Sequence, residues 1–322
     1  MTKPGIGPGG GRLDAKQIYR KYGILLIFAA MFVVSALLNR NFLKPMNLIN
    51  IVRQISVITL VACAETMLIV SGMIDLSAGA LVAFTGCVAA GVMAATRSLP
   101  AAIAAGLLLG GLCGWVNGFM VTRFGLQPFI ATLAMTNIAN GITQVYTGGS
   151  AISGIGEMSF LGQGYLGPIP VPVAIMLVFL CLTWVLMRCT KFGLYIYSIG
   201  GNEKATAASG VDVNRTKRLI FLLGGVLVGL GGIILMARLN SGQPSVGPGY
   251  EFDGITAAVI GGTSFTGGVG SVFGTLVGSL IVGMINNILN LMNVSTQYQL
   301  IMKGVLIAGA VTLDVSTKKS RA

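Results

Sequence analysis

The polar side chains that recur at helical spacing in this chain are neutral amides. Asn137, Asn140 and Gln144 are three and four residues apart, and Asn286 and Asn290 are four apart, so each set shares one face of a helix. Amides can exchange hydrogen bonds with a polyhydroxylated solute without burying a charge. They can equally join neighbouring helices, and the spacing leaves both interpretations open. The candidate residues of a solute path are Glu65, Asn117, Asn137, Asn140, Gln144, Asn286, Asn287 and Asn290.

The residue types needed for most enzymatic chemistry are missing. The chain has no histidine, which excludes a Ser-His-Asp hydrolase and a histidine-ligated metal. Its five cysteines show no Cys-x-x-Cys spacing and are interpreted as buried small apolar residues. No Gly-x-x-x-x-Gly-Lys-[Ser/Thr] motif occurs, so the chain does not bind ATP through a P-loop. We therefore expect no catalytic residue, metal or cofactor.

The composition is that of a membrane protein with many spans. Apolar residues make up 54% of the chain and charged residues 9%, against about 25% charged residues in soluble domains. Glu65 is the only carboxylate well inside an apolar run, and this scarcity argues against an ion-coupled carrier, which needs buried ionisable relays. The 47 glycines favour closely packed helices. We predict an all-α transmembrane bundle with about ten spans, at 22–38, 49–70, 77–96, 100–122, 127–146, 170–187, 218–236, 252–267, 271–291 and 298–314.

The positions of the basic residues predict the topology. The net charge of +12 gathers at the ends of apolar runs and is not interleaved with aromatic residues, which argues against nucleic-acid binding. Because Lys and Arg concentrate on cytoplasmic loops, we expect both termini and the loop 188–217 to be cytoplasmic. The first apolar run lacks a small-residue cleavage site and is interpreted as a retained helix. The expected parts are a disordered tail over 1–21, a transmembrane domain over 22–315 and a tail over 316–322.

Two glycine-containing interruptions suggest a faint internal repeat. The stretch Ser71–Gly79 separates two apolar runs, and Gly261–Gly268 interrupts a later one. An offset of 189 residues pairs Gly72 with Gly261. Broken segments at corresponding places in two halves are typical of a transport pathway; the alternative is two ordinary tight connections. The repeat-related candidates are Gly72, Asp75, Ser77, Gly261, Gly262 and Ser264.

The loop 188–217 contains the signals of a short helix. Gly200 and Gly201 can break the chain, Asn202 is a good N-cap, and Gly210 is a natural C-cap. The small side chains between them would let this helix seat closely in a groove of another protein. Alternatively, it is a connector on the membrane surface.

Five separated stretches carry a resemblance to a known family. Thr190–Val211, Ser71–Ser77, Gly261–Ser264, Phe129–Leu133 and Gly249–Glu251 occur in the expected order. Together they resemble the membrane permeases of bacterial ribose-type ABC importers, over roughly residues 40–315.

The resemblance implies a homodimeric pore in the bacterial inner membrane for ribose or a related monosaccharide. It also implies a periplasmic sugar-binding protein and a cytoplasmic ABC ATPase as partners, with ATP hydrolysed by the ATPase and not by this chain. The residues that would form the coupling helix are Asn202, Glu203, Ala205, Ala207 and Gly210. Lys204 follows the glutamate directly, so the match to the family's Glu-Ala-Ala…Gly element is loose. A self-sufficient carrier or channel explains the spans and amides equally well, but it leaves the loop 188–217 without a purpose.

Overall fold

The helices of the computed structural model, which describes residues 15–319, follow the apolar runs of the sequence. Among these residues, six helices are long and apolar enough to cross a membrane: α2 (Pro45–Val70), α3 (Ala78–Thr96), α4 (Leu99–Arg123), α7 (Val171–Cys189), α10 (Val213–Leu239) and α12 (Val272–Leu291). The other main helices are α1 (Ala15–Leu38), α5 (Pro128–Thr147), α11 (Tyr250–Ile260) and α13 (Thr296–Lys319). The short elements are η1 (Gly156–Ser159), α6 (Phe160–Gln163), α8 (Lys191–Gly201), α9 (Glu203–Ala208) and the antiparallel pair β1 (Tyr165–Leu166) and β2 (Ile169–Pro170).

This architecture confirms the predicted all-α class. Each predicted span overlaps one of the main helices, while the number of crossings and the side of the termini stay predictions. The span predicted at 252–267 is wrong at its end, because α11 stops at Ile260 and Gly262 adopts a φ of 91°. The expected tails overlap the ends of α1 and α13; their residues 1–14 and 320–322 lie outside the described residues.

The interior is organised around α10, which packs on α4, α3 and α2. Glycines allow the closest of these approaches, since a Cβ atom on Gly110 or Gly225 would collide with the carbonyl oxygen of the other. Large apolar side chains such as Phe221 and Ile234 are fully buried beside them. The prediction of buried cysteines holds for Cys63, Cys87 and Cys113. It is wrong for Cys181, on the outward face of α7, and for Cys189, at the end of that helix, which are both exposed.

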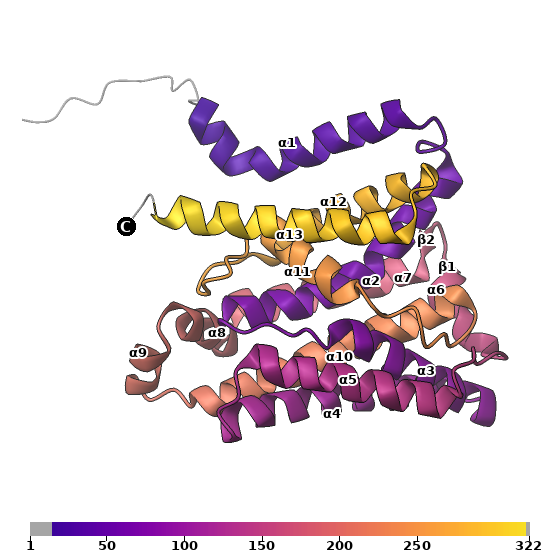
Figure 1. Cartoon of the computed structure of the whole chain (residues 1–322), viewed down its shortest axis with the longest axis horizontal. Helices are drawn as coiled ribbons and strands as arrows, with labels where there is room; N and C mark the ends of the chain where they lie inside the picture. The colour runs from indigo at the N-terminus through magenta and orange to yellow at the C-terminus, as the bar shows by residue number, and fades with distance from the viewer. Residues whose placement is uncertain (1–14, 320–322) are drawn as a thin grey trace, which may run out of the picture.

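The two ends of the bundle carry different short elements (Figure 1). Helices α8 and α9 lie at one end, where α1 also begins and α13 finishes. We call this the α9 end. The β1–β2 pair and α6 lie at the opposite end, which we call the hairpin end. There the Arg53 guanidinium donates to Gln163 O at 2.7 Å and lies over the Tyr165 ring, so the N-terminal half of α2 holds the hairpin.

Candidate functional site

The amides of α5 occupy one exposed face of that helix. Asn137 and Gln144 are exposed and Asn140 is half-buried. Asn137 Nδ2 donates to Leu133 O within the same helix at 3.2 Å. The opposite side of α5 packs on α3 and α4. This face therefore presents amide groups away from the rest of the chain, where a solute or a second protein could reach them.

Asn117 of α4 is buried and binds the loop between α2 and α3. Its Nδ2 donates to Ser77 Oγ at 3.0 Å, and Ser77 Oγ donates to the Asp75 carboxylate. From the α5 side, Thr132 Oγ1 accepts from Leu76 N at 3.1 Å. The loop is thus held between α4 and α5. These contacts favour the helix-joining interpretation for Asn117.

Asn286 belongs to a buried polar cluster that joins three helices. Its Nδ2 on α12 donates to Asp253 Oδ2 on α11 at 3.1 Å. Lys303 Nζ on α13 lies 2.8 Å from Asp253 Oδ1 and 3.0 Å from Oδ2. The Asp253 side chain is only 6% exposed, so the ion pair and the amide compensate a carboxylate removed from water.

Asn287 and Asn290 also contact other helices. Asn287 and Asn47 exchange two side-chain hydrogen bonds of 2.9 and 3.1 Å between α12 and α2. Asn290 Oδ1 accepts from Gln299 Nε2 at 2.8 Å. Of the two interpretations left open by the sequence, helix joining accounts for the contacts of these α12 amides.

Glu65 is fully buried in α2 against α11. A Cβ atom on Gly254 would lie 3.3 Å from Glu65 Cγ, so the glycine makes room for the glutamate. Neither carboxyl oxygen has a hydrogen-bond partner among the described residues. Arg53, twelve residues earlier, is engaged at the hairpin instead. A fully buried, unpartnered acid inside a bundle marks a functional candidate.

The two interruptions predicted as a repeat share one backbone motif. Gly72 N donates to Ile69 O and Met73 N to Leu68 O at the end of α2. Gly262 N and Thr263 N make the same two bonds at the end of α11, to Val259 O and Ala258 O. Both are Schellman motifs, with Gly72 and Gly262 at positive φ. The two left-handed glycines lie 190 residues apart, against the predicted offset of 189, because Gly262 and not Gly261 occupies the left-handed position. The same pair of bonds also ends α5 and α10, so the internal repeat stays a prediction.

The other repeat-related residues lie close to these motifs. Ser264 N donates to Val269 O at 3.0 Å inside the second loop. Gly261 packs against α12, since a Cβ atom on it would lie 2.6 Å from Gly274 O. The first loop is anchored by Asp75 and Ser77 to α4, as described above.

The short helix predicted in the loop 188–217 is present as α9. Asn202 Oδ1 accepts from Ala205 N at 2.9 Å, and Gly210 has a φ of 85° just after the helix, as the sequence predicts. Glu203 forms a 2.7 Å ion pair with Lys217 at the start of α10. The five predicted coupling residues are all exposed: Asn202, Glu203, Ala205, Ala207 and Gly210.

Sequence reasoning missed helix α8, which precedes α9 directly. Its N-cap is Thr190, whose Oγ1 accepts from Gly193 N at 3.1 Å. That threonine was a usable signal. A groove of about 420 Å³ separates the two helices; among its lining residues are Tyr195, Ser198 and Thr206.

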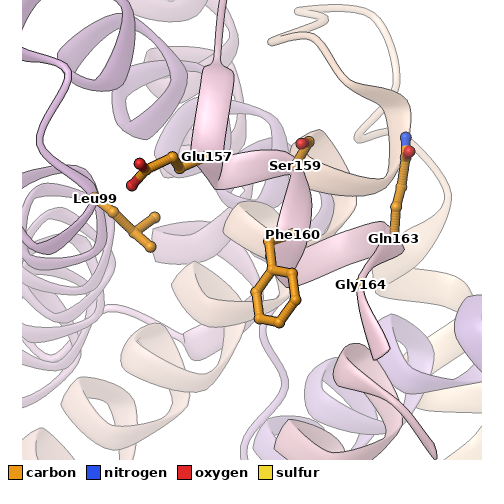
Figure 2. A pocket seen from close by; sticks show the side chains of 6 residues that line it. All are labelled: Leu99, Glu157, Ser159, Phe160, Gln163 and Gly164. Carbon is orange, nitrogen blue, oxygen red and sulfur yellow. The ribbon is translucent and has the colours of Figure 1, made fainter. Parts of the chain in front are cut away.

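A second hollow at the hairpin end was also missed. Figure 2 shows Glu157 extending toward Leu99 on one side of this pocket, with Gln163 on the other. The cavity volume is about 540 Å³. Only tertiary contact brings the start of α4 to η1 and α6, so no local pattern predicts it. The complete lining is Leu99, Glu157, Ser159, Phe160, Gln163 and Gly164.

Known proteins resemble this chain over almost its whole length. Residues 47–311 match a family model described as branched-chain amino acid transport system / permease component. The ribose import permease protein RbsC of Bacillus subtilis (strain 168) is 42% identical over 94% of this chain and 95% of its own length. The same-named protein of Escherichia coli (strain K12) is 43% identical over 95% and 97%. The D-allose transport system permease protein AlsC of that organism is 39% identical over 91% of both chains. No solved structure matches.

Proposed function

The chain belongs to the branched-chain amino acid transport system / permease component family, and on that premise we propose that it is the permease subunit of an ATP-driven importer of a monosaccharide such as ribose. Its relatives are named as permeases for ribose, D-allose and L-arabinose, at 38–43% identity. In this function the protein is a multi-pass component of the bacterial inner membrane and not itself an enzyme.

The exposed helix α9 is the observation that carries the coupling part of the proposal. A partner ATPase needs a surface that can follow its movements. Helix α9 projects at one end of the bundle (Figure 1), with one buried residue, Thr206, in its six. Its ion pair to Lys217 ties it to α10. We assign the contact with the ATPase to the exposed residues Asn202, Glu203, Ala205, Ala207 and Gly210.

The basic residues support placing the α9 end in the cytoplasm. Arg188, Lys191, Lys204, Arg215, Lys217 and Arg218 all lie between the end of α7 and the first turns of α10, and such residues are retained on the cytoplasmic side. In this orientation α1 begins and α13 ends in the cytoplasm. The hairpin end then faces the periplasm, where a sugar-binding protein would deliver its cargo.

The exposed amide face of α5 is the best candidate for the translocation path. Lipid tails offer no hydrogen-bond partners. Exposed amides in a span therefore indicate that this face borders a water-filled space or another protein. We propose that a second copy of the chain faces α5 and encloses such a path, so that the pore is a homodimer. Asn137, Asn140 and Gln144 would then exchange hydrogen bonds with sugar hydroxyl groups. Glu65, buried between α2 and α11, stays a second candidate for the path.

Reconstitution tests this function directly. Radiolabelled ribose, allose or arabinose is added outside proteoliposomes that contain the chain, with and without its partner ATPase and binding protein, and with ATP at the ATPase face. Uptake only with all components would support the importer. Uptake by the chain alone would favour the alternative, a self-sufficient carrier or channel.

A further inference from the structure

Helix α8 touches two chain segments that are far apart in sequence. A Cβ atom on Gly200 would collide with Val70 O, the last carbonyl of α2, and would lie 2.5 Å from Gly268 N. Gly268 N donates to that same Val70 oxygen at 2.8 Å. On the loop side, a Cβ atom on Gly267 would lie 2.7 Å from Gly200 O. Three backbones thus meet at one point, and only glycines permit the approach.

A side-chain hydrogen bond reinforces this junction one turn away. Tyr197 Oη on α8 donates to Gly270 O at 3.0 Å. Burial raises the pKa of the Tyr197 hydroxyl above its ordinary value; the hydroxyl is protonated at neutral pH with or without this shift and can donate. Gly270 in turn packs on α2 and on its own loop, since a Cβ atom there would collide with Val70 Cγ2 and lie 3.0 Å from Thr263 Oγ1. The start of α12 is therefore fixed to α8 through the residues just before it.

Helices α8 and α9 are joined by a single residue, Asn202. Asn202 ends α8, because its N–H donates to Ser198 O at 2.9 Å. The same residue caps α9, because its Oδ1 accepts from Ala205 N and its carbonyl oxygen from Thr206 N. One residue belongs to both helix ends, so a displacement of α9 also displaces α8.

We infer that α8 is the element that transmits movement of α9 to the end of α2 and to the loop that leads from α11 into the start of α12, with Gly200 and Tyr197 as positioning residues. This inference rests on the proposed coupling of α9 to an ATPase. Both repeat-related loops adjoin this junction, because Val70 directly precedes the first loop and Gly268 lies in the second. Packed elements in direct contact carry such displacement.

The adjacent glycines of α8 provide a matched pair of variants. A Cβ atom on Gly200 enters the junction, whereas one on Gly201 meets no atom within 4 Å. Gly200→Ala and Gly201→Ala are compared in proteoliposomes with the ATPase and binding protein. The readouts are uptake of radiolabelled ribose, allose and arabinose, ATP hydrolysis in the same vesicles, and the amount of ATPase that copurifies with the chain.

We expect Gly200→Ala to lower uptake about tenfold or more at unchanged ATPase binding. Hydrolysis should continue but lose its stimulation by sugar-loaded binding protein, which a merely structural defect would not cause. Gly201→Ala should behave as wild type. Tyr197→Phe, which removes one hydroxyl and leaves the packing intact, should raise the ATP consumed per sugar about threefold.

Wild-type stoichiometry of ATP to sugar in both Gly200→Ala and Tyr197→Phe overturns the inference. If Gly200→Ala does not assemble with the ATPase, Tyr197→Phe decides alone: a raised ratio supports the inference and an unchanged ratio overturns it. A failure of the proposed function is distinguishable, because wild-type uptake would then not require the ATPase at all.

Discussion

Lys303 Nζ lies 2.8 Å from Asp253 Oδ1, so a buried ion pair joins α13 to the short helix α11. The same carboxylate accepts from Asn286 on α12. One acidic residue therefore holds together three helices of the C-terminal part. Removal of either charge leaves the other without its partner in a place that water reaches poorly.

Lys303→Met should destabilise the protein more than the charge-free double variant. It leaves the Asp253 carboxylate uncompensated, at a cost of about 3–5 kcal/mol. Adding Asp253→Asn removes the stranded charge and should recover most of the loss. Thermal unfolding in detergent measures both. Equal melting temperatures for the single and double variants would contradict this prediction, because the stranded carboxylate would then cost nothing.

The close contact of α4 and α10 should not tolerate a single added methyl group. Gly225→Ala places a Cβ atom against Gly110 O, and overpacking of this kind costs about 1–3 kcal/mol or more. Gly304→Ala on α13 is the control, because a Cβ atom there meets no atom within 4 Å. We expect a lower melting temperature for Gly225→Ala alone. An equal fall in melting temperature for Gly304→Ala would show that the loss of a glycine, and not the collision with Gly110, lowers the stability.

Local features of the site were predictable from sequence, and long-range contacts were not. The N-cap Asn202 and the left-handed Gly210 depend on neighbours within a few residues, and both were predicted correctly. Lys303 and Asp253 are 50 residues apart, and no periodic pattern pairs them. The extent of α11 was overestimated because the predicted span was continued into the interruption at Gly261–Gly268, whereas the helix stops at Ile260, two residues before the left-handed Gly262.

The amides also show that sequence predicts local geometry but not long-range contacts. Their spacing predicted correctly that Asn137 and Gln144 share a face, because helical geometry is local. Which neighbour each face meets depends on packing. Asn117, Asn286 and Asn287 have similar sequence surroundings to the α5 amides, yet they bind other segments of the chain.

Asn137→Ala and Asn287→Ala should therefore have different consequences. Asn137 is exposed and bonds within its own helix, so its loss should lower sugar uptake without changing the melting temperature. Loss of Asn287 strands the Asn47 amide and should lower stability by about 1–3 kcal/mol. Uptake and thermal unfolding are measured for both. If Asn137→Ala instead lowers the amount of protein in the membrane, the α5 amides join helices.

Gly210→Val should uncouple ATP hydrolysis from transport while the chain still inserts. Gly210 has a φ of 85° and closes the exposed α9 segment; a β-branched residue is strained there, so the segment that would contact the ATPase must change shape. Gly125→Val is a matched control, because Gly125 also has positive φ and open space around it but lies between α4 and α5. The measurement is sugar uptake per ATP hydrolysed in the reconstituted importer. We expect a fall for Gly210→Val and a wild-type ratio for Gly125→Val, since only the first alters α9. Normal transport by Gly210→Val would refute the assignment of α9 as the coupling helix.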